Sequence, residues 1–131
     1  MSRHSVSFLF SHIVFVTKYR RKVLTKSIIE DIRIILTNVC NCYNVKILEF
    51  EGESDHVHLL IQFTPSVRLC DLIRTLKTQS SSYIMEKYKD YITTYLWKDT
   101  LWTPSYFICT CGGAPLEIIK NYIQNQESPR T

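Results

Sequence analysis

The stretch from Asp55 to Phe63 constrains the fold of this chain more than any other part of the sequence. In it, four apolar residues, Val57, Leu59, Ile61 and Phe63, alternate with His56, His58, Leu60 and Gln62. Alternation at period two is typical of a β-strand whose side chains point to opposite faces. Both histidines therefore lie on one face, about 7 Å apart along the strand. The stretch predicts a strand with an apolar core face and two potential metal ligands on its other face.

Composition limits the class of protein to which the chain can belong. Its 131 residues suffice for one domain with a hydrophobic core, so we expect a single domain over residues 1–131. Hydrophobic residues make up 45% and charged residues 21%, which excludes a disordered chain. The net charge of +4 is compatible with a polyanionic partner. Since we find neither a membrane-length apolar run nor a signal-peptide cleavage pattern, we expect a soluble cytoplasmic protein without a membrane partner.

Cysteine spacing gives no support for a zinc site or a disulfide framework. The five cysteines are Cys40, Cys42, Cys70, Cys109 and Cys111. Their odd number prevents complete internal pairing, and they form two C-x-C pairs without any C-x-x-C. We expect free, mostly buried thiols in a reducing compartment.

Hydrophobic periodicity predicts an order of strands and helices. We expect strands over residues 6–16, 45–50, 55–63 and 105–111, and helices beginning after Thr25 or Ser27, after 64–66, and at Pro115. Residues 51–54 read as a tight connection in which Gly52 permits a turn, so that the second and third strands form a hairpin. Residues 88–102 read as a loop with short helical or extended pieces. The βαββαβ order predicts an α+β, ferredoxin-like fold, with an antiparallel sheet, helices on one face and an additional C-terminal helix.

The predicted final helix carries Tyr122 and Gln126, which lie one turn apart on one face. Beside a divalent metal, a tyrosine hydroxyl can attack a phosphodiester and form a covalent phosphotyrosyl bond. The Gln126 amide oxygen, together with His56 and His58, would complete a three-ligand site with open positions for phosphate oxygens. Mixed nitrogen and oxygen ligands with a phosphate substrate favour Mg²⁺ or Mn²⁺. On the residues alone, an incidental H-x-H pair and a tyrosine used only for packing stay open as alternatives.

Basic residues gather at two places that are candidates for contact with DNA phosphates. A cluster around one aromatic follows the first strand: Lys18, Tyr19, Arg20, Arg21 and Lys22. Arg74 and Lys77 lie on a polar stripe of the second helix. Both sets are either solvated surface or phosphate contacts, and the second reading predicts salt-sensitive binding. Tyr19, Phe107 or Trp102 would then be candidates to stack unpaired bases.

Four blocks of the sequence resemble the single-tyrosine HUH transposases of small insertion sequences, the two-hundred/six-hundred-and-five group. The blocks are His12–Arg21, Asp55–Leu60, Leu101–Phe107 and Tyr122–Gln126. Asp55–Leu60 resembles the histidine–hydrophobic–histidine motif from which these enzymes take their name. The blocks occur in the family's order and span nearly the whole chain. The acidic residues in 51–54 depart from the usual lead-in to the motif.

The resemblance implies a particular activity and a set of site residues. His56, His58 and Gln126 would bind the divalent metal, Mg²⁺ or Mn²⁺, and Tyr122 would be the nucleophile. The substrate would be single-stranded DNA with hairpins near the element ends, cut to a 5′-phosphotyrosine and a free 3′-OH and rejoined without ATP. The resemblance also implies an obligate homodimer, in which the final helix can complete the partner's active site.

Three alternatives remain beside that expectation. A domesticated relative would process repeated genomic hairpins with the same chemistry. A non-catalytic single-stranded nucleic-acid-binding module has the same element order, but such modules usually carry stacking aromatics where this strand carries His56 and His58. A metal-dependent hydrolase is also compatible with the histidines, although it would leave Tyr122 without a role.

Overall fold

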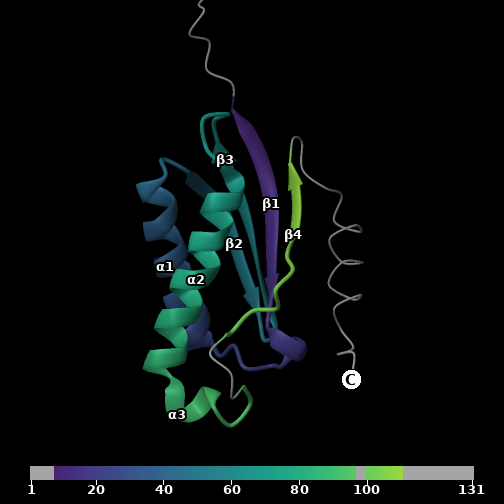
Figure 1. The fold of residues 1–131 in the computed structure, drawn as a ribbon, viewed down its shortest axis with the longest axis vertical. Helices are drawn as coiled ribbons and strands as arrows, with labels where there is room; N and C mark the ends of the chain where they lie inside the picture. Colours follow the sequence, from purple (N-terminus) through teal and green to yellow (C-terminus); the bar gives the residue numbers. More distant parts are fainter. Residues whose placement is uncertain (1–7, 97–99, 111–131) are drawn as a thin grey trace, which may run out of the picture.

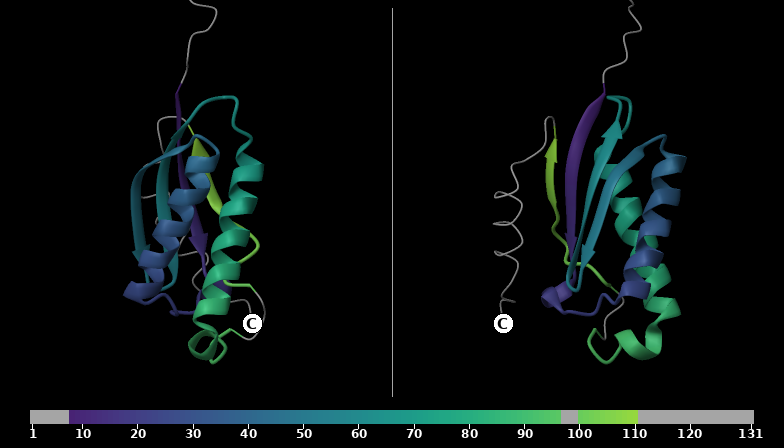
Figure 2. Two further views of the ribbon diagram at one scale, coloured as in Figure 1. Left: turned by 90° about the vertical axis from the view of Figure 1, so that its left-hand side faces the viewer. Right: turned by 180° about the vertical axis from the view of Figure 1, so that it is seen from behind.

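The computed structural model describes residues 8–96 and 100–110. Within these residues, four strands form one sheet in the order β2-β3-β1-β4, and all neighbours are antiparallel. The strands are β1 (Leu9–Val16), β2 (Lys46–Glu53), β3 (His56–Phe63) and β4 (Phe107–Thr110). The long helices α1 (Lys26–Cys42) and α2 (Leu69–Lys87) cover one face of this sheet, as Figures 1 and 2 show from three sides. The predicted ferredoxin-like βαββαβ fold is therefore confirmed, while the predicted C-terminal helix lies outside the described residues.

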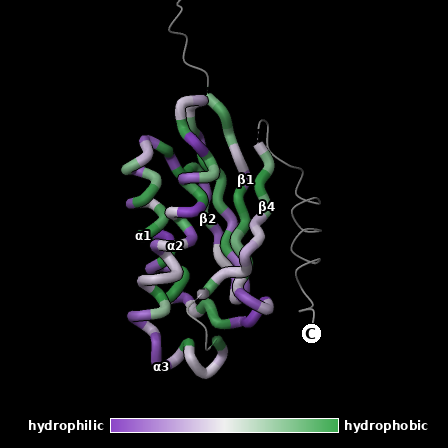
Figure 3. Tube along the Cα trace, in the orientation of Figure 1, coloured by the Kyte–Doolittle hydropathy of each residue, from purple (hydrophilic) through white to green (hydrophobic). Residues whose placement is uncertain are grey.

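The hydrophobic core lies between the sheet and the two long helices. Apolar residues of β3 point into it, and their exposed fractions do not exceed 3%: Val57, Leu59, Ile61 and Phe63. Ile28, Ile32 and Leu36 of α1 meet them at helical spacing, with Leu72 and Leu76 of α2 beside them. Figure 3 shows apolar residues running along β1 and β4 of the same sheet. Burial of each large aliphatic side chain contributes about 1.5–3 kcal/mol, so the period-two pattern of β3 determines which face meets the helices.

The edge strand β2 is longer than the sequence suggests. It continues through Glu53 instead of ending at Phe50, because Glu51, Gly52 and Glu53 pair with β3. Gly52 therefore does not form a turn. A Cβ atom at Gly52 would lie 2.6 Å from Cγ2 of Ile29, so the absent side chain allows α1 to approach the sheet closely. The turn of the hairpin is instead formed by Ser54 and Asp55.

The ends of the other elements match the expectations in part. Thr25 caps α1 as predicted, since its Oγ1 accepts a hydrogen bond of 3.2 Å from the Ile28 amide. The predicted cap of α2 at 64–66 is wrong, because Thr64 and Ser66 bond to each other and the helix begins only at Leu69. Residues 88–102 contain the short helix α3 (Lys89–Ile92) and an isolated bridge between Thr17 and Trp102, as expected. β1 begins at Leu9, later than the predicted 6–16, and β4 covers only part of 105–111.

Two structural facts bear on the compositional expectations. The described cysteines are free, but Cys42 and Cys70 are exposed at helix ends, so the expectation of mostly buried thiols is wrong for them. Burial raises the pKa of Cys40 to about 12. Among the helices of residues 8–96 and 100–110, none is long and apolar enough to cross a membrane.

Candidate metal and nucleic-acid site

His56 and His58 lie side by side on the face of the sheet that points away from α1 and α2. Their neighbours Val57 and Leu59 point into the core, so the pleat places both histidines on the opposite face. Both are half-buried. On β2, Glu53 lies opposite His56 and Glu51 lies opposite His58. The predicted sharing of one face by the two imidazoles is confirmed.

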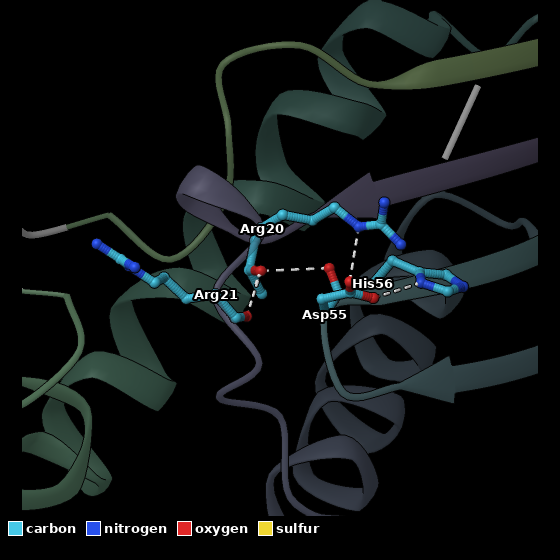
Figure 4. A network of polar contacts seen from close by, with 5 residues as sticks. Arg20, Arg21, Asp55 and His56 are labelled. Atoms are coloured by element: carbon cyan, nitrogen blue, oxygen red, sulfur yellow. Dashed lines mark hydrogen bonds and ion pairs between the residues drawn. The ribbon is translucent and has the colours of Figure 1, made fainter. Parts of the chain in front are cut away.

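His56 is held by a buried carboxylate. Its Nδ1 lies 2.9 Å from Oδ1 of Asp55, and Oδ2 of Asp55 lies 2.6 Å from Nε of Arg20. Figure 4 shows Arg20 reaching from the turn after β1 to this carboxylate. Asp55 is only 5% exposed, and a buried carboxylate requires such partners because it has lost its hydration. Arg20, Asp55 and His56 therefore form one continuous polar chain.

His58 is held by a second imidazole, that of His12 on β1. Nδ1 of His12 lies 2.8 Å from Nε2 of His58, and the two rings are nearly parallel with centroids 5.0 Å apart. One ring donates and the other accepts. Burial lowers the pKa of His58; charges on His12 and His56 lower it too, while Glu51 and Glu49 act in the opposite direction. His58 is therefore biased toward the neutral form that a metal requires.

Sequence reasoning did not single out His12 as a site residue. It lies in the first block of the resemblance, yet its meeting with His58 depends on the register between β1 and β3. In that register His12 pairs with Leu60, which places it diagonally next to His58 on the same face. Residues of β1 are apolar on both faces, so the sequence of this strand indicates neither the face that His12 occupies nor its position along β3.

The two histidines fit a divalent ion as part of a ligand set. Neutral imidazoles on a rigid strand suit such an ion, but no group of three His, Cys, Asp or Glu within the described residues could hold a metal. A third ligand of another type or from another part of the chain is needed. The predicted ligand Gln126 and the predicted nucleophile Tyr122 both lie outside the described residues.

The basic cluster after β1 forms a tight turn with an unusual backbone. Tyr19 and Arg20 have φ angles of 56° and 54°, which lie in the left-handed region that residues other than glycine rarely adopt. Thr17 holds the turn, because its carbonyl accepts from the Arg20 amide at 2.8 Å and its hydroxyl donates to the Arg21 carbonyl at 2.6 Å. Buried Thr17 also donates to the carbonyl of Asp55, which ties the turn to the β2–β3 hairpin.

This turn separates the predicted DNA contacts into outward and inward side chains. Tyr19 is 53% exposed, and Lys18 Nζ and Arg21 Cζ lie 5.8 and 5.9 Å from its ring centroid. Arg21 and Lys22 are exposed, whereas Arg20 is directed to Asp55. Tyr19, Arg21 and Lys22 are thus available to a ligand, and contact of any of these residues with DNA stays a prediction.

The two basic residues of the polar stripe on α2 differ in their surroundings, because Lys77 packs against the segment that leads into β4 and Arg74 faces solvent. Lys77 Nζ donates to the carbonyls of Thr103, Pro104 and Ser105 at 2.6, 3.1 and 3.2 Å. Burial lowers the pKa of Lys77. Arg74, in contrast, is exposed and pairs with Asp71 of its own helix at 3.0 Å. Lys77 therefore fastens the chain, which limits its availability to a phosphate.

An open pocket of about 430 Å³ brings the two basic regions together. Lys18 and Lys77 both line it, with hydroxyl-bearing residues of α2 and of the 100–104 segment. Trp102 is only 2% exposed, and its indole N–H donates to Ser80 Oγ at 2.9 Å. Trp102 is thus packed in the core, and Tyr19 is the better placed aromatic for a base.

The fold and the half-buried histidine pair define a ferredoxin-like α+β protein with potential metal ligands on the open face of its sheet. A family model described as “Transposase IS200 like” matches residues 5–126. The chain belongs to this family of IS200-like transposases.

Individual relatives agree with this assignment. The ISDra2 transposase TnpA of Deinococcus radiodurans is 30% identical over 115 residues, which cover 88% of this chain and 81% of that protein. A transposase for insertion sequence IS200 from Salmonella typhimurium is 32% identical over 115 residues, covering 88% of this chain and 74% of the relative.

Two solved structures share the fold. A candidate transposase from Deinococcus radiodurans superposes with a TM-score of 0.86 at 28% identity, covering 98% of both chains. A REP-associated tyrosine transposase bound to a REP hairpin superposes with a TM-score of 0.55 at 15% identity, covering 95% of this chain and 68% of that one. The second likeness concerns the fold alone.

Proposed function

We propose that this transposase cuts and rejoins single-stranded DNA at insertion-sequence ends by metal-assisted transesterification. The observation that carries the proposal is the pair of imidazoles on the open face of β3. His56 and His58 share that face, and each is held by a partner, Asp55 or His12. Oriented, neutral imidazoles are the form in which histidine binds a metal. Membership in the IS200-like family supports DNA as the substrate.

The chain's own residues would divide the reaction between them. His56, His58 and Gln126 would hold Mg²⁺ or Mn²⁺, which would polarise the scissile phosphodiester. The Tyr122 hydroxyl attacks phosphorus, the bond from phosphorus to the 3′ oxygen breaks, and the proton lost by tyrosine is balanced by protonation of that oxygen. The products are a 5′-phosphotyrosine and a free 3′-OH. Because the ester bond is conserved, a second 3′-OH can reverse the step on another strand without ATP.

The DNA partner would be recognised through hairpins near the ends. The structure of the REP-associated transposase holds a REP hairpin, which makes a hairpin the appropriate first ligand to test. The exposed Tyr19, Arg21 and Lys22 would meet unpaired bases and phosphates next to the histidines. A homodimer would supply two tyrosines, with Tyr122 completing either its own site or that of its partner. The reaction would take place in the cytoplasm.

A labelled hairpin-bearing single strand incubated with Mg²⁺ tests the proposal. We expect a covalent protein–DNA adduct that Tyr122→Phe abolishes, while hairpin binding is retained. His56→Ala should lose cleavage and keep binding, because the histidine serves the chemistry and not the DNA contact. An adduct that persists in Tyr122→Phe would refute the assignment of the nucleophile.

The alternatives give different outcomes in the same assay. A non-catalytic binding module would bind the hairpin without forming an adduct in the intact protein. A metal-dependent hydrolase would still cleave after Tyr122→Phe. A domesticated relative would behave as proposed in the tube, and only the genomic surroundings of its gene, with or without element ends, would identify it.

A further inference from the structure

Asp55 and Arg20 form a polar chain with His56 that determines which nitrogen of His56 carries the proton. The carboxylate of Asp55 has one partner on each oxygen, His56 Nδ1 at 2.9 Å and Arg20 Nε at 2.6 Å. An ionised carboxylate can only accept hydrogen bonds. His56 Nδ1 must therefore donate, and in a neutral imidazole this leaves Nε2 without a proton.

We propose that Asp55 is a positioning residue that holds His56 in the Nδ1–H tautomer, so that Nε2 is the nitrogen available to the metal, and that Arg20 stabilises the buried Asp55 carboxylate that does so. The tautomer itself is a property of the metal-free protein, and only its use for a metal rests on the proposed function. In metal sites, a hydrogen-bond acceptor on the other ring nitrogen commonly orients a histidine ligand. His58 differs: among residues 8–96 and 100–110 the hydrogen-bond partner of its ring is His12, at Nε2, and not a carboxylate.

The backbone on both sides of the Arg20–Asp55–His56 hydrogen-bond chain holds its side chains in place. Arg20 has a φ angle of 54°, and its side chain is only 16% exposed although it lies in a turn with exposed neighbours. The Asp55 carbonyl accepts from both the amide and the hydroxyl of Thr17, at 2.9 and 3.2 Å. The turn after β1 and the β2–β3 turn are thus joined at both the main chain and the side chain of Asp55.

Asp55→Asn gives a sharp test because an amide has one acceptor and one donor side. Arg20 offers only donors, so the amide oxygen should turn to Arg20 and the NH₂ group to His56. His56 Nδ1 must then accept, and the proton moves to Nε2. We expect long-range ¹⁵N NMR of the metal-free protein at pH 8 to show a protonated Nδ1 in the native chain and a protonated Nε2 in this variant. Mn²⁺ affinity should fall by about 10–100-fold.

The double variant Arg20→Met with Asp55→Asn should reverse this effect. Without the guanidinium, the amide oxygen is free to accept from His56 Nδ1, which restores the tautomer and most of the Mn²⁺ affinity. Arg20→Met alone should keep the tautomer but lower thermal stability, because it removes the cationic partner of a buried carboxylate. Asp71→Asn is the matched control, since Asp71 pairs with Arg74 on α2 and should leave the His56 signals unchanged.

The outcomes separate this inference from the proposed function. A native spectrum with the proton on Nε2 of His56 would overturn the inference without any variant. An Asp55→Asn protein that folds and keeps both the native tautomer and the native Mn²⁺ affinity would overturn it as well. If the tautomers follow the expectation but the native protein does not bind Mn²⁺, the positioning of the proton stands and the proposed metal site fails.

Discussion

Gly52→Ala should destabilise the fold through one close contact between β2 and α1. The added Cβ would lie 2.6 Å from Cγ2 and 3.1 Å from Cγ1 of Ile29. Ile29 is β-branched and therefore stiff at χ1, so it cannot rotate away freely. Forcing an extra methyl group into a packed site costs about 1–3 kcal/mol. At about 4 °C per kcal/mol, the melting temperature should fall by about 4–12 °C.

Thermal unfolding followed by circular dichroism measures the melting temperature, and urea unfolding measures the free energy of unfolding, with the slope m as a check that the transition remains two-state. Ile29→Ala provides the internal control, because it removes the atoms that the new Cβ would meet. The double variant should be about as stable as Ile29→Ala alone, which gives a coupling energy of about 1 kcal/mol or more. If Gly52→Ala is neutral, or if Ile29→Ala does not suppress its effect, the inferred approach of α1 to β2 is incorrect.

Three further predictions follow from the site. Lys77→Met should lower the free energy of unfolding by about 1–2 kcal/mol, because it removes a charged donor from three carbonyls. Substitution of the exposed Arg74 by alanine should change the free energy of unfolding by less than about 0.5 kcal/mol. Thermal unfolding of the two variants compares these effects. The pKa of His58 is lowered in the folded state by burial first and by His12 next, so the unfolded chain binds more protons below about pH 6.5. Stability should therefore decline as pH falls below that value, and His58→Asn should flatten this part of a urea-midpoint profile. Arg21→Ala and Lys22→Ala should each reduce the salt slope of single-strand binding by about 0.7, and unchanged slopes in a fluorescence titration would remove these residues from the DNA contact.

Local pattern in the sequence was sufficient for the order of the described strands and long helices and for the faces of the histidine strand, although not for every element boundary. The period-two alternation of 55–63 predicted which side chains enter the core, and the structure confirms it. The Thr25 cap of α1 was also predictable, because the hydrogen bond joins residues three positions apart. The resemblance pointed to the IS200-like family, and the family match confirms it. The roles of Tyr122 and Gln126 remain predictions.

Tertiary structure decided what surrounds each histidine. His12 and His58 are 46 positions apart in the chain, and Arg20 and Asp55 are 35 apart. The pairing of β1 with β3 brings the first two together, and the meeting of the turns at the ends of these strands brings the other two together. Gly52 suggested a turn, yet its small size serves the contact with α1. Arg20 and Lys77 looked like surface cations but bind Asp55 and three carbonyls. The physical reason is that alternation specifies a face, whereas pairing across the sheet and packing between elements specify which side chains on that face meet.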